Sequence, residues 1–410
     1  MTRKTHSLVS ALKEIIFSQL SPERRYLLNC LRRMLAQNNR LENQAASADT
    51  VNWDTFLTLA EVNRLIPILH PLTPLFSDQG MPGHLVESMR RHYLSNAHRA
   101  FIVMAELARV AESMARNGIK VFPLKGSLLA LQLYGDISRR YAGDIDILVE
   151  AAQVQKAYYV LRELGYRCAP KAARLQPSRV EQYKVLNKDG SFFHTELGIM
   201  VDLHWRLLGE RHLIRNNDTG WFGEKREYRE MGRVAFPCMD RERLLLYLCL
   251  HGSIHLWERL FWLYDVATLI RQNPDLDWDH IITEAEGLGC LRSLLLGTVL
   301  VHLLLETPVP DVLHDRWEQT PALRYLCLRS YPCSVNPILP PKTVTRSVRH
   351  FCYAIRLRDL RQNVPYLIHK IFLPGKEWPD VPIALLPVYF ILKPIIKARI
   401  ISGRPAGSLR

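Results

Sequence analysis

Two aspartates two positions apart are the residues of this chain best suited to chemistry. Asp144 and Asp146 lie in the run Gly-Asp-Ile-Asp-Ile-Leu-Val, residues 143–149. Side chains i and i+2 of a strand share one face, so both carboxylates should point the same way while Ile145 and Ile147 are buried on the other face. The pattern also fits an acidic edge strand that faces solvent. However, two like charges raise each other's pKa unless a cation neutralises them, and paired hard oxygens suit Mg²⁺ or Mn²⁺ together with substrate phosphates.

A turn shortly before these aspartates is suited to binding phosphate. Lys125, Gly126 and Ser127 precede an apolar run that reads as a helix. The free N–H groups and the positive end of the dipole at a helix N-terminus favour an anion. Gly126 and Ser127 could also serve only as helix entry and cap, and Lys125 could pair with Asp144 or face solvent. Beside an acidic strand, the turn predicts a triphosphate site.

A third carboxylate stands on another predicted strand. The run Met-Val-Asp-Leu-His-Trp, residues 200–205, alternates so that Asp202 and His204 share one face. If this strand lies beside the first, Asp202 completes a three-carboxylate metal site. Its expected role is to ligate the metal nearer the attacking hydroxyl and to accept the proton of that hydroxyl. His204 could orient a substrate, support a metal ligand or pack in the core beside Trp205.

Arg140 is a further candidate for the same site, because it lies just ahead of the acidic strand. It could neutralise charge that develops on nucleotide phosphates, or it could form a surface ion pair.

A polar stripe in an otherwise apolar segment supplies further candidates. Its members are spaced 4, 3, 4 and 3 residues apart, as on one face of a helix, and they are His251, His255, Glu258, Trp262 and Asp265. Histidines at i and i+4 can share a zinc ion, but the metalloprotease motif requires Glu where Gly252 stands. The stripe therefore predicts residues that line a nucleotide or acceptor cleft, with a buried network between domains as the alternative.

Taken in order, these segments resemble the DNA polymerase beta-type nucleotidyltransferase superfamily. The wider context is Leu-Lys-Gly-Ser at 124–127, Arg140 ahead of 143–149, Val-Asp-Leu-His-Trp at 201–205, and Leu-His-Gly-Ser-Ile-His-Leu-Trp at 250–257. That set is similar to the bacterial uncharacterised nucleotidyltransferase family, and the resemblance covers roughly residues 53–309. It implies a small mixed β-sheet embedded in helical regions, with the three aspartates around divalent cations.

The resemblance and the residues together predict a metal-dependent nucleotidyltransferase. The expected reaction transfers a nucleoside monophosphate from an NTP, with ATP as the expected donor, to an acceptor hydroxyl and releases pyrophosphate by a two-metal mechanism. The acceptor could be a small molecule, a protein side chain or an RNA end. The alternative function is a non-catalytic nucleotide-binding scaffold or regulator with the same fold.

Composition and charge limit the setting of this activity. Eight scattered cysteines without Cys-x-x-Cys spacing argue against a zinc ribbon or a disulfide framework, and for a reducing compartment. The N-terminus shows no secretory signal, so we expect a cytoplasmic protein. The net charge of +14 is concentrated at the two ends, where residues 1–40 contribute +6 and residues 341–410 contribute +10. These basic ends could contact an anionic surface such as RNA or lipid headgroups, or form a solvated basic face.

The pattern of hydrophobic residues predicts an α+β protein. We expect a basic helical N-terminal extension at 1–48, a helical region at 49–117, the nucleotidyltransferase core at 118–210, a helical C-terminal domain at 211–340, and a basic, proline-broken tail at 341–410. An apolar run at 381–392 is too short to span a bilayer as a helix, which needs about 20 residues, so no transmembrane span is expected. That run could lie at a membrane interface or pack onto the body.

Overall fold

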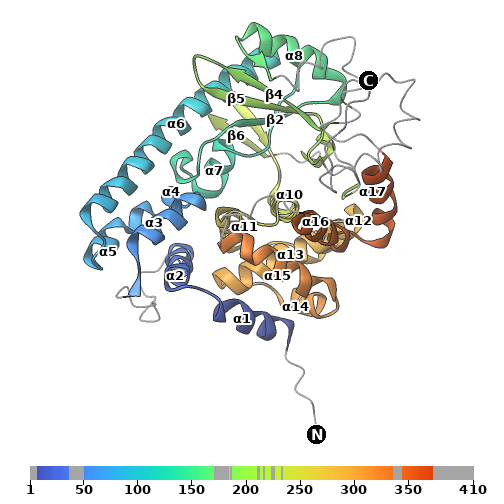
Figure 1. The fold of residues 1–410 in the computed structure, drawn as a ribbon. Coiled ribbons are helices and arrows are strands. Elements are labelled where there is room, and N and C mark those ends of the chain that lie inside the picture. Colours follow the sequence, from blue (N-terminus) through green and yellow to red (C-terminus); the bar gives the residue numbers. More distant parts are fainter. Residues whose placement is uncertain are drawn as a thin grey trace, which may run out of the picture.

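The structure is a computed structural model that describes residues 7–36, 50–169, 184, 187–209, 213–215, 218–222, 227–231, 234–335 and 344–372. Within these residues a mixed sheet lies at one side of the molecule, and helices flank it and fill the other side (Figure 1). The predicted α+β class, with a small mixed sheet between helical regions, is confirmed. The apolar run at 381–392 lies outside the described residues.

The central sheet of the described chain has five strands in the order β1-β2-β5-β4-β3. Their bounds are β1 Phe122–Pro123, β2 Ile145–Leu148, β3 Arg167–Cys168, β4 Asp189–His194 and β5 Ile199–His204. Strands β2 and β5 are parallel, whereas the other neighbouring pairs are antiparallel. In the parallel pair Asp146 lies opposite Asp202, and Leu148 lies opposite His204. Directly opposed residues share a face, so the two aspartates belong to one side of the sheet.

The two faces of the sheet have different neighbours. Ile145, Ile147 and Val201 belong to a hydrophobic cluster with the second half of α6 (Gly83–Arg116) and with α8 (Val154–Glu163). Figure 1 shows α6 and α8 on the outer side of the sheet. Leu148, on the aspartate side, belongs instead to the cluster that contains α10. The acidic face is therefore turned toward the helical part of the molecule.

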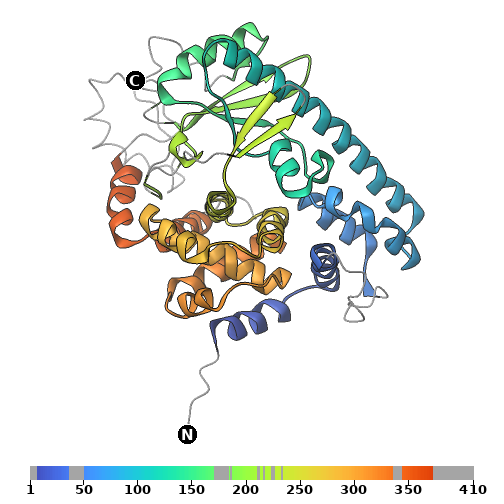
Figure 2. The same ribbon diagram turned by 180° about the vertical axis from the view of Figure 1, so that it is seen from behind.

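The helical part is built from helices of both ends of the chain. The C-terminal helices are α10 Arg241–Ile254, α11 Leu260–Gln272, α12 Trp278–Leu288, α13 Leu291–Leu305, α14 Asp311–Glu318, α15 Ala322–Val335, α16 Val344–Leu357 and α17 Leu360–Phe372. The N-terminal helices are α1 Leu8–Ser18, α2 Pro22–Ala36, α3 Trp53–Val62, α4 Ile66–Leu69 and α5 Thr73–Asp78. Helices α1 and α2 pack against α13, and both groups share one hydrophobic cluster (Figure 2). The domain boundaries drawn from the sequence stay predictions.

The polar stripe predicted on one helix is divided between two helices. Helix α10 ends at Ile254 and α11 begins at Leu260. Between them, Leu256 and Trp257 adopt φ values of 52° and 53°, a left-handed conformation that ends a right-handed helix. The prediction of one continuous stripe from His251 to Asp265 is therefore wrong, because a reversal of the chain interrupts the helical period.

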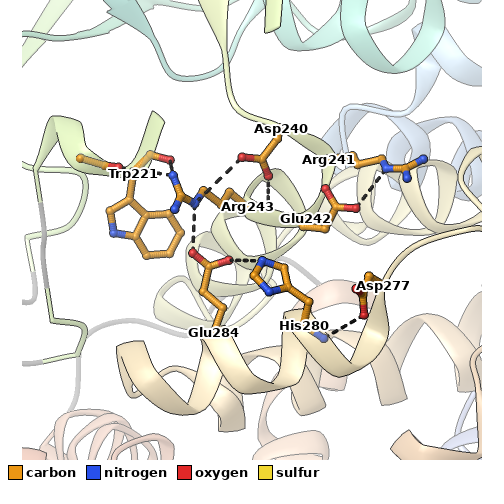
Figure 3. Close-up of polar contacts among 9 residues, drawn as sticks. Trp221, Asp240, Arg241, Glu242, Arg243, Asp277, His280 and Glu284 are labelled. Carbon is orange, nitrogen blue, oxygen red and sulfur yellow. Dashed lines mark hydrogen bonds and ion pairs between the residues drawn. The ribbon is translucent and has the colours of Figure 1, made fainter. Parts of the chain in front are cut away.

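A polar network fixes the start of α10, which follows a hairpin of β6 (Glu227–Met231) and β7 (Val234–Cys238). The carboxylate of Asp240 caps α10 by accepting the N–H of Arg243 at 2.9 Å. The guanidinium of Arg243 donates to Glu284 of α12 at 3.0 Å, as Figure 3 shows. The network therefore ties the start of α10 to α12.

No helix in the described part of the chain is both long enough and apolar enough to cross a membrane.

Close packing at the turn after α10 leads to a stability prediction. A Cβ placed on Gly252 would overlap the ring of Trp257, which is fully buried. We expect Gly252→Ala to lower the free energy of unfolding by about 1–3 kcal/mol through overpacking, as measured by chemical denaturation. A Cβ added at Gly287 in α12 would have no atom within 4 Å of it. As a control, Gly287→Ala should raise the stability by about 0.5–1 kcal/mol through helix propensity, and equal effects of the two substitutions would contradict this account of the packing.

Candidate active site

The parallel register of β2 and β5 brings Asp146 and Asp202 together with His204. One carboxylate oxygen of each aspartate and one ring nitrogen of His204 lie within 4.8 Å of one another. Within the described residues this is the one group of three His, Cys, Asp or Glu side chains with such spacing. The sequence prediction that Asp202 lies beside the first acidic strand agrees with this geometry.

Asp146 is held as a charged carboxylate by two neighbours. Its side chain is 10% exposed, and its two oxygens contact His204 Nε2 at 2.9 Å and Lys125 Nζ at 3.3 Å. Burial alone would raise the pKa of Asp146. The Lys125 ammonium and the hydrogen bond from His204 outweigh that effect and hold the pKa well below its usual range. Asp146 is therefore ionised throughout the neutral range.

Asp202 has the opposite balance of interactions. Burial raises the pKa of Asp202, and the negative charges of Asp146 and Asp144 add to the rise, while a hydrogen bond from Ser191 opposes it. Its Oδ1 atom is buried and has no hydrogen-bond partner in the structure. A buried carboxylate oxygen without a partner costs free energy. A cation placed between Asp146 and Asp202 would remove that cost, so the donor set fits a divalent metal ion.

Asp144 lies outside the close group of side chains formed by Asp146, Asp202 and His204. It immediately precedes β2 and is exposed. Burial is the main cause of the raised pKa of Asp202, and the negative charge of Asp144 adds to it. Asp144 therefore lies near the acidic pair. The role of Asp144 as a metal ligand stays a prediction.

The predicted phosphate turn borders the acidic strand. Gly126 has φ 70° and ψ −139° and precedes α7 (Ser127–Tyr134). This backbone conformation is open almost only to glycine, and a Cβ on Gly126 would lie 3.6 Å from the carbonyl oxygen of Asp144. The first N–H groups of a helix have no partners inside the helix. The hydroxyl of Ser127 is also buried and has no hydrogen-bond partner among the described residues. The turn therefore offers donors next to the carboxylates, as a phosphate site requires.

The two predicted histidines lie on the helical side of the site. The ring of His251 lies 4.7 Å from that of His255 and 5.0 Å from that of Trp262, measured between centroids. Burial lowers the pKa of His251 well below its usual value, and the charges of Lys125 and His255 add to the effect. His255 is exposed at its surface, and the pKa of its ring is lowered by partial removal from water first and then by Lys125 and Lys188. Both rings are therefore neutral near pH 7 and close to the cations around Asp146.

Glu258 and Arg140 make no contact with Asp146 or Asp202 among the described residues. The half-buried side chain of Glu258 makes no ion pair among the described residues. The guanidinium of Arg140 is buried, with its Nε atom 3.1 Å from the carboxylate of Asp265 in α11. The phenol of Tyr134 donates to the same carboxylate at 2.5 Å. A nucleotide contact by Arg140 stays a prediction, and the structure gives its guanidinium a partner on the helical side.

Sequence reasoning missed Lys188, which precedes β4. Its ammonium lies 3.4 Å from Nδ1 of His204 and 2.9 Å from the carboxylate of Asp189. Together with Lys125 it places a second positive charge beside the acidic pair. A lone lysine before a strand carries no sequence signal for such a role, because the contact depends on how β4 pairs with β5.

The comparisons with known proteins agree with this geometry. The model of the uncharacterised nucleotidyltransferase family matches residues 49–306, which is more than half of the chain. The matched range contains the sheet, the turn before α7, and helices α10 to α13. No curated protein and no solved structure matches the chain. The resemblance seen in the sequence is thus confirmed, and the chain belongs to the uncharacterised nucleotidyltransferase family.

Proposed function

We propose that this nucleotidyltransferase moves a nucleoside monophosphate from an NTP to an acceptor hydroxyl at the face formed by β2 and β5. The observation that carries the proposal is the buried, unpartnered Oδ1 of Asp202 directly opposite the ionised Asp146. Family membership supports transfer of a nucleotidyl group, and the acidic pair supports dependence on a divalent cation.

Asp146 and Asp202 would hold the cation, and Asp144 would join them. A bound divalent ion would supply a Lewis acid for phosphate oxygens and offset the charge of the carboxylates. His204 orients Asp146 through its Nε2 hydrogen bond, the kind of support that fixes the geometry of a metal ligand. Mg²⁺ is the expected ion because the donors are hard carboxylate oxygens.

The chain positions the two substrates from opposite sides. The N–H groups that start α7, with Lys125 beside them, would bind the polyphosphate. His251 and His255 are neutral and would face the nucleotide or the acceptor without adding charge. Because positioning and fixed charges contribute most of the catalysis in this kind of transfer, the preformed arrangement of these groups matters more than any covalent step.

In the proposed reaction the acceptor oxygen forms a bond to the α-phosphorus while the bond from that phosphorus to the bridging oxygen breaks. Pyrophosphate leaves, and the carboxylate of Asp202 accepts the proton of the acceptor hydroxyl. Burial raises the pKa of Asp202, which makes its carboxylate a stronger base than a free aspartate. ATP as the donor, the acceptor class, a second metal ion and a cytoplasmic location remain predictions. The alternative of a non-catalytic nucleotide-binding scaffold makes no use of a proton acceptor at this position.

Removal of either charge tests the proposal. We expect Asp146→Asn and Asp202→Asn each to lower transfer by at least about 100-fold, because each variant loses a charged ligand for the cation that would act on the phosphate. The measurement is incorporation of label into cell extract from an α-labelled NTP, with a γ-labelled NTP giving none. Asp78→Asn, at the exposed C-terminal end of α5, is the matched control. Binding of NTP without transfer in the wild type would favour the scaffold, and label from the γ-position alone would indicate phosphoryl transfer.

Metal binding can be measured without turnover. We expect Mg²⁺ to raise the thermal midpoint of the wild type, since a ligand that binds only the native state stabilises it. EDTA should reverse the rise. The Asp146→Asn/Asp202→Asn double variant should show no such rise, because the opposed carboxylates are gone. An equal rise in the wild type and the double variant would place the ion elsewhere and remove this support for the site.

A further inference from the structure

A cavity of about 920 Å³ lies at the other end of α7 from the phosphate turn. It is lined from the C-terminal end of α2, the end of α7, and α11, which lie near one another on the helical side of the molecule (Figure 1). None of the residues placed at the acidic site lines it. Its volume falls in the range of about 300–1,000 Å³ that is usual for small-molecule sites.

The wall of the cavity is positively charged. Arg139 and Arg271 line it, and none of its described lining residues is an aspartate or a glutamate. Both guanidiniums act on the phenol of Tyr264, another lining residue, where they oppose the rise in its pKa that burial causes. Each arginine has an acidic neighbour: Arg139 lies 3.8 Å from the carboxylate of Asp136, and Glu306 attracts Arg271. These acidic groups stand outside the wall, so the cavity itself presents donors.

Two of the lining residues carry buried polar atoms that lack partners. Thr268 is 6% exposed, and its hydroxyl has no hydrogen-bond partner in the structure. The Nε atom of Arg271 is also buried and has no partner in the described part of the chain, although its Nη2 atom donates to the carbonyl of Glu306 at 2.7 Å. An unmade hydrogen bond at a buried group costs about 1–3 kcal/mol. Acceptor oxygens between α11 and the Arg139 side would supply what these two groups lack.

Part of the wall is apolar, and this part includes Leu35, Ile68, Trp278 and Val309. An inorganic anion would contact only the arginine side and leave these residues facing water. A ligand with an anionic head and an apolar or aromatic body would satisfy both parts of the wall.

We propose that this cavity binds an organic phosphate monoester with an apolar body, at a site separate from the nucleotide. A phosphate dianion matches two guanidiniums in charge, and its oxygens match their planar donor geometry. The proposal does not depend on the reaction assigned to the acidic face, because no residue is shared between the two sites.

Titration calorimetry of the full chain with phenyl phosphate tests the proposal. We expect saturable binding that is weaker for inorganic phosphate, which lacks the apolar body, and weaker for benzoate, which carries a single charge. Arg139→Gln and Arg271→Gln should each raise the Kd at least tenfold, and Thr268→Val should raise it severalfold. Arg229→Gln, which changes an exposed arginine of the β6–β7 hairpin, is the matched control and should leave the Kd unchanged.

Three results would overturn the proposal. They are no heat of binding in the wild type at millimolar phenyl phosphate, a Kd unchanged in both arginine variants, and loss of binding in the Asp146→Asn/Asp202→Asn variant. The last result would place the probe at the acidic face. A thermal midpoint is recorded for each variant, and Thr268→Val, which keeps the shape of the side chain, decides the matter if an arginine variant fails to fold. Failure of nucleotidyl transfer alone would leave this binding result standing.

Discussion

The parallel pairing of β2 with β5 forces two carboxylates to lie opposite each other. The other groups of the site lie around this pair of like charges. A shift by one residue would turn Asp202 toward α6 and α8, where apolar side chains fill the space. The hydrophobic face of the sheet therefore fixes the register, and the register fixes the acidic pair. Packing energy on one face is thus used to hold unfavourable charge on the other.

The charges around the pair are divided unequally. Lys125 and His204 both contact Asp146, whereas Asp202 has a buried oxygen with no hydrogen-bond partner among the residues that the structure describes. As a result the pKa of Asp146 is lowered and that of Asp202 is raised, although the two residues are of the same type and lie side by side. Different environments can thus assign different tasks to identical side chains.

The sequence contained the local features of this site but not its long-range contacts. Strict alternation around Asp146 and Asp202 predicted both strands and the face that each aspartate takes, since a period of two is a local property. The end of the helix before Leu256 could not be predicted from the sequence, because a left-handed conformation at a residue other than glycine does not change the hydrophobic pattern. The burial of Arg140 was also hidden, since its partner Asp265 lies 125 positions away. Distant pairings of this kind depend on the packing of whole elements.

The contact between Arg140 and Asp265 has a mechanical consequence. Asp265 is 0% exposed, so a separation of the two groups would strand a charge in a dry environment. The chain just ahead of β2 is therefore fastened to α11, and any separation of the sheet from the helices at this point carries the cost of breaking a buried ion pair.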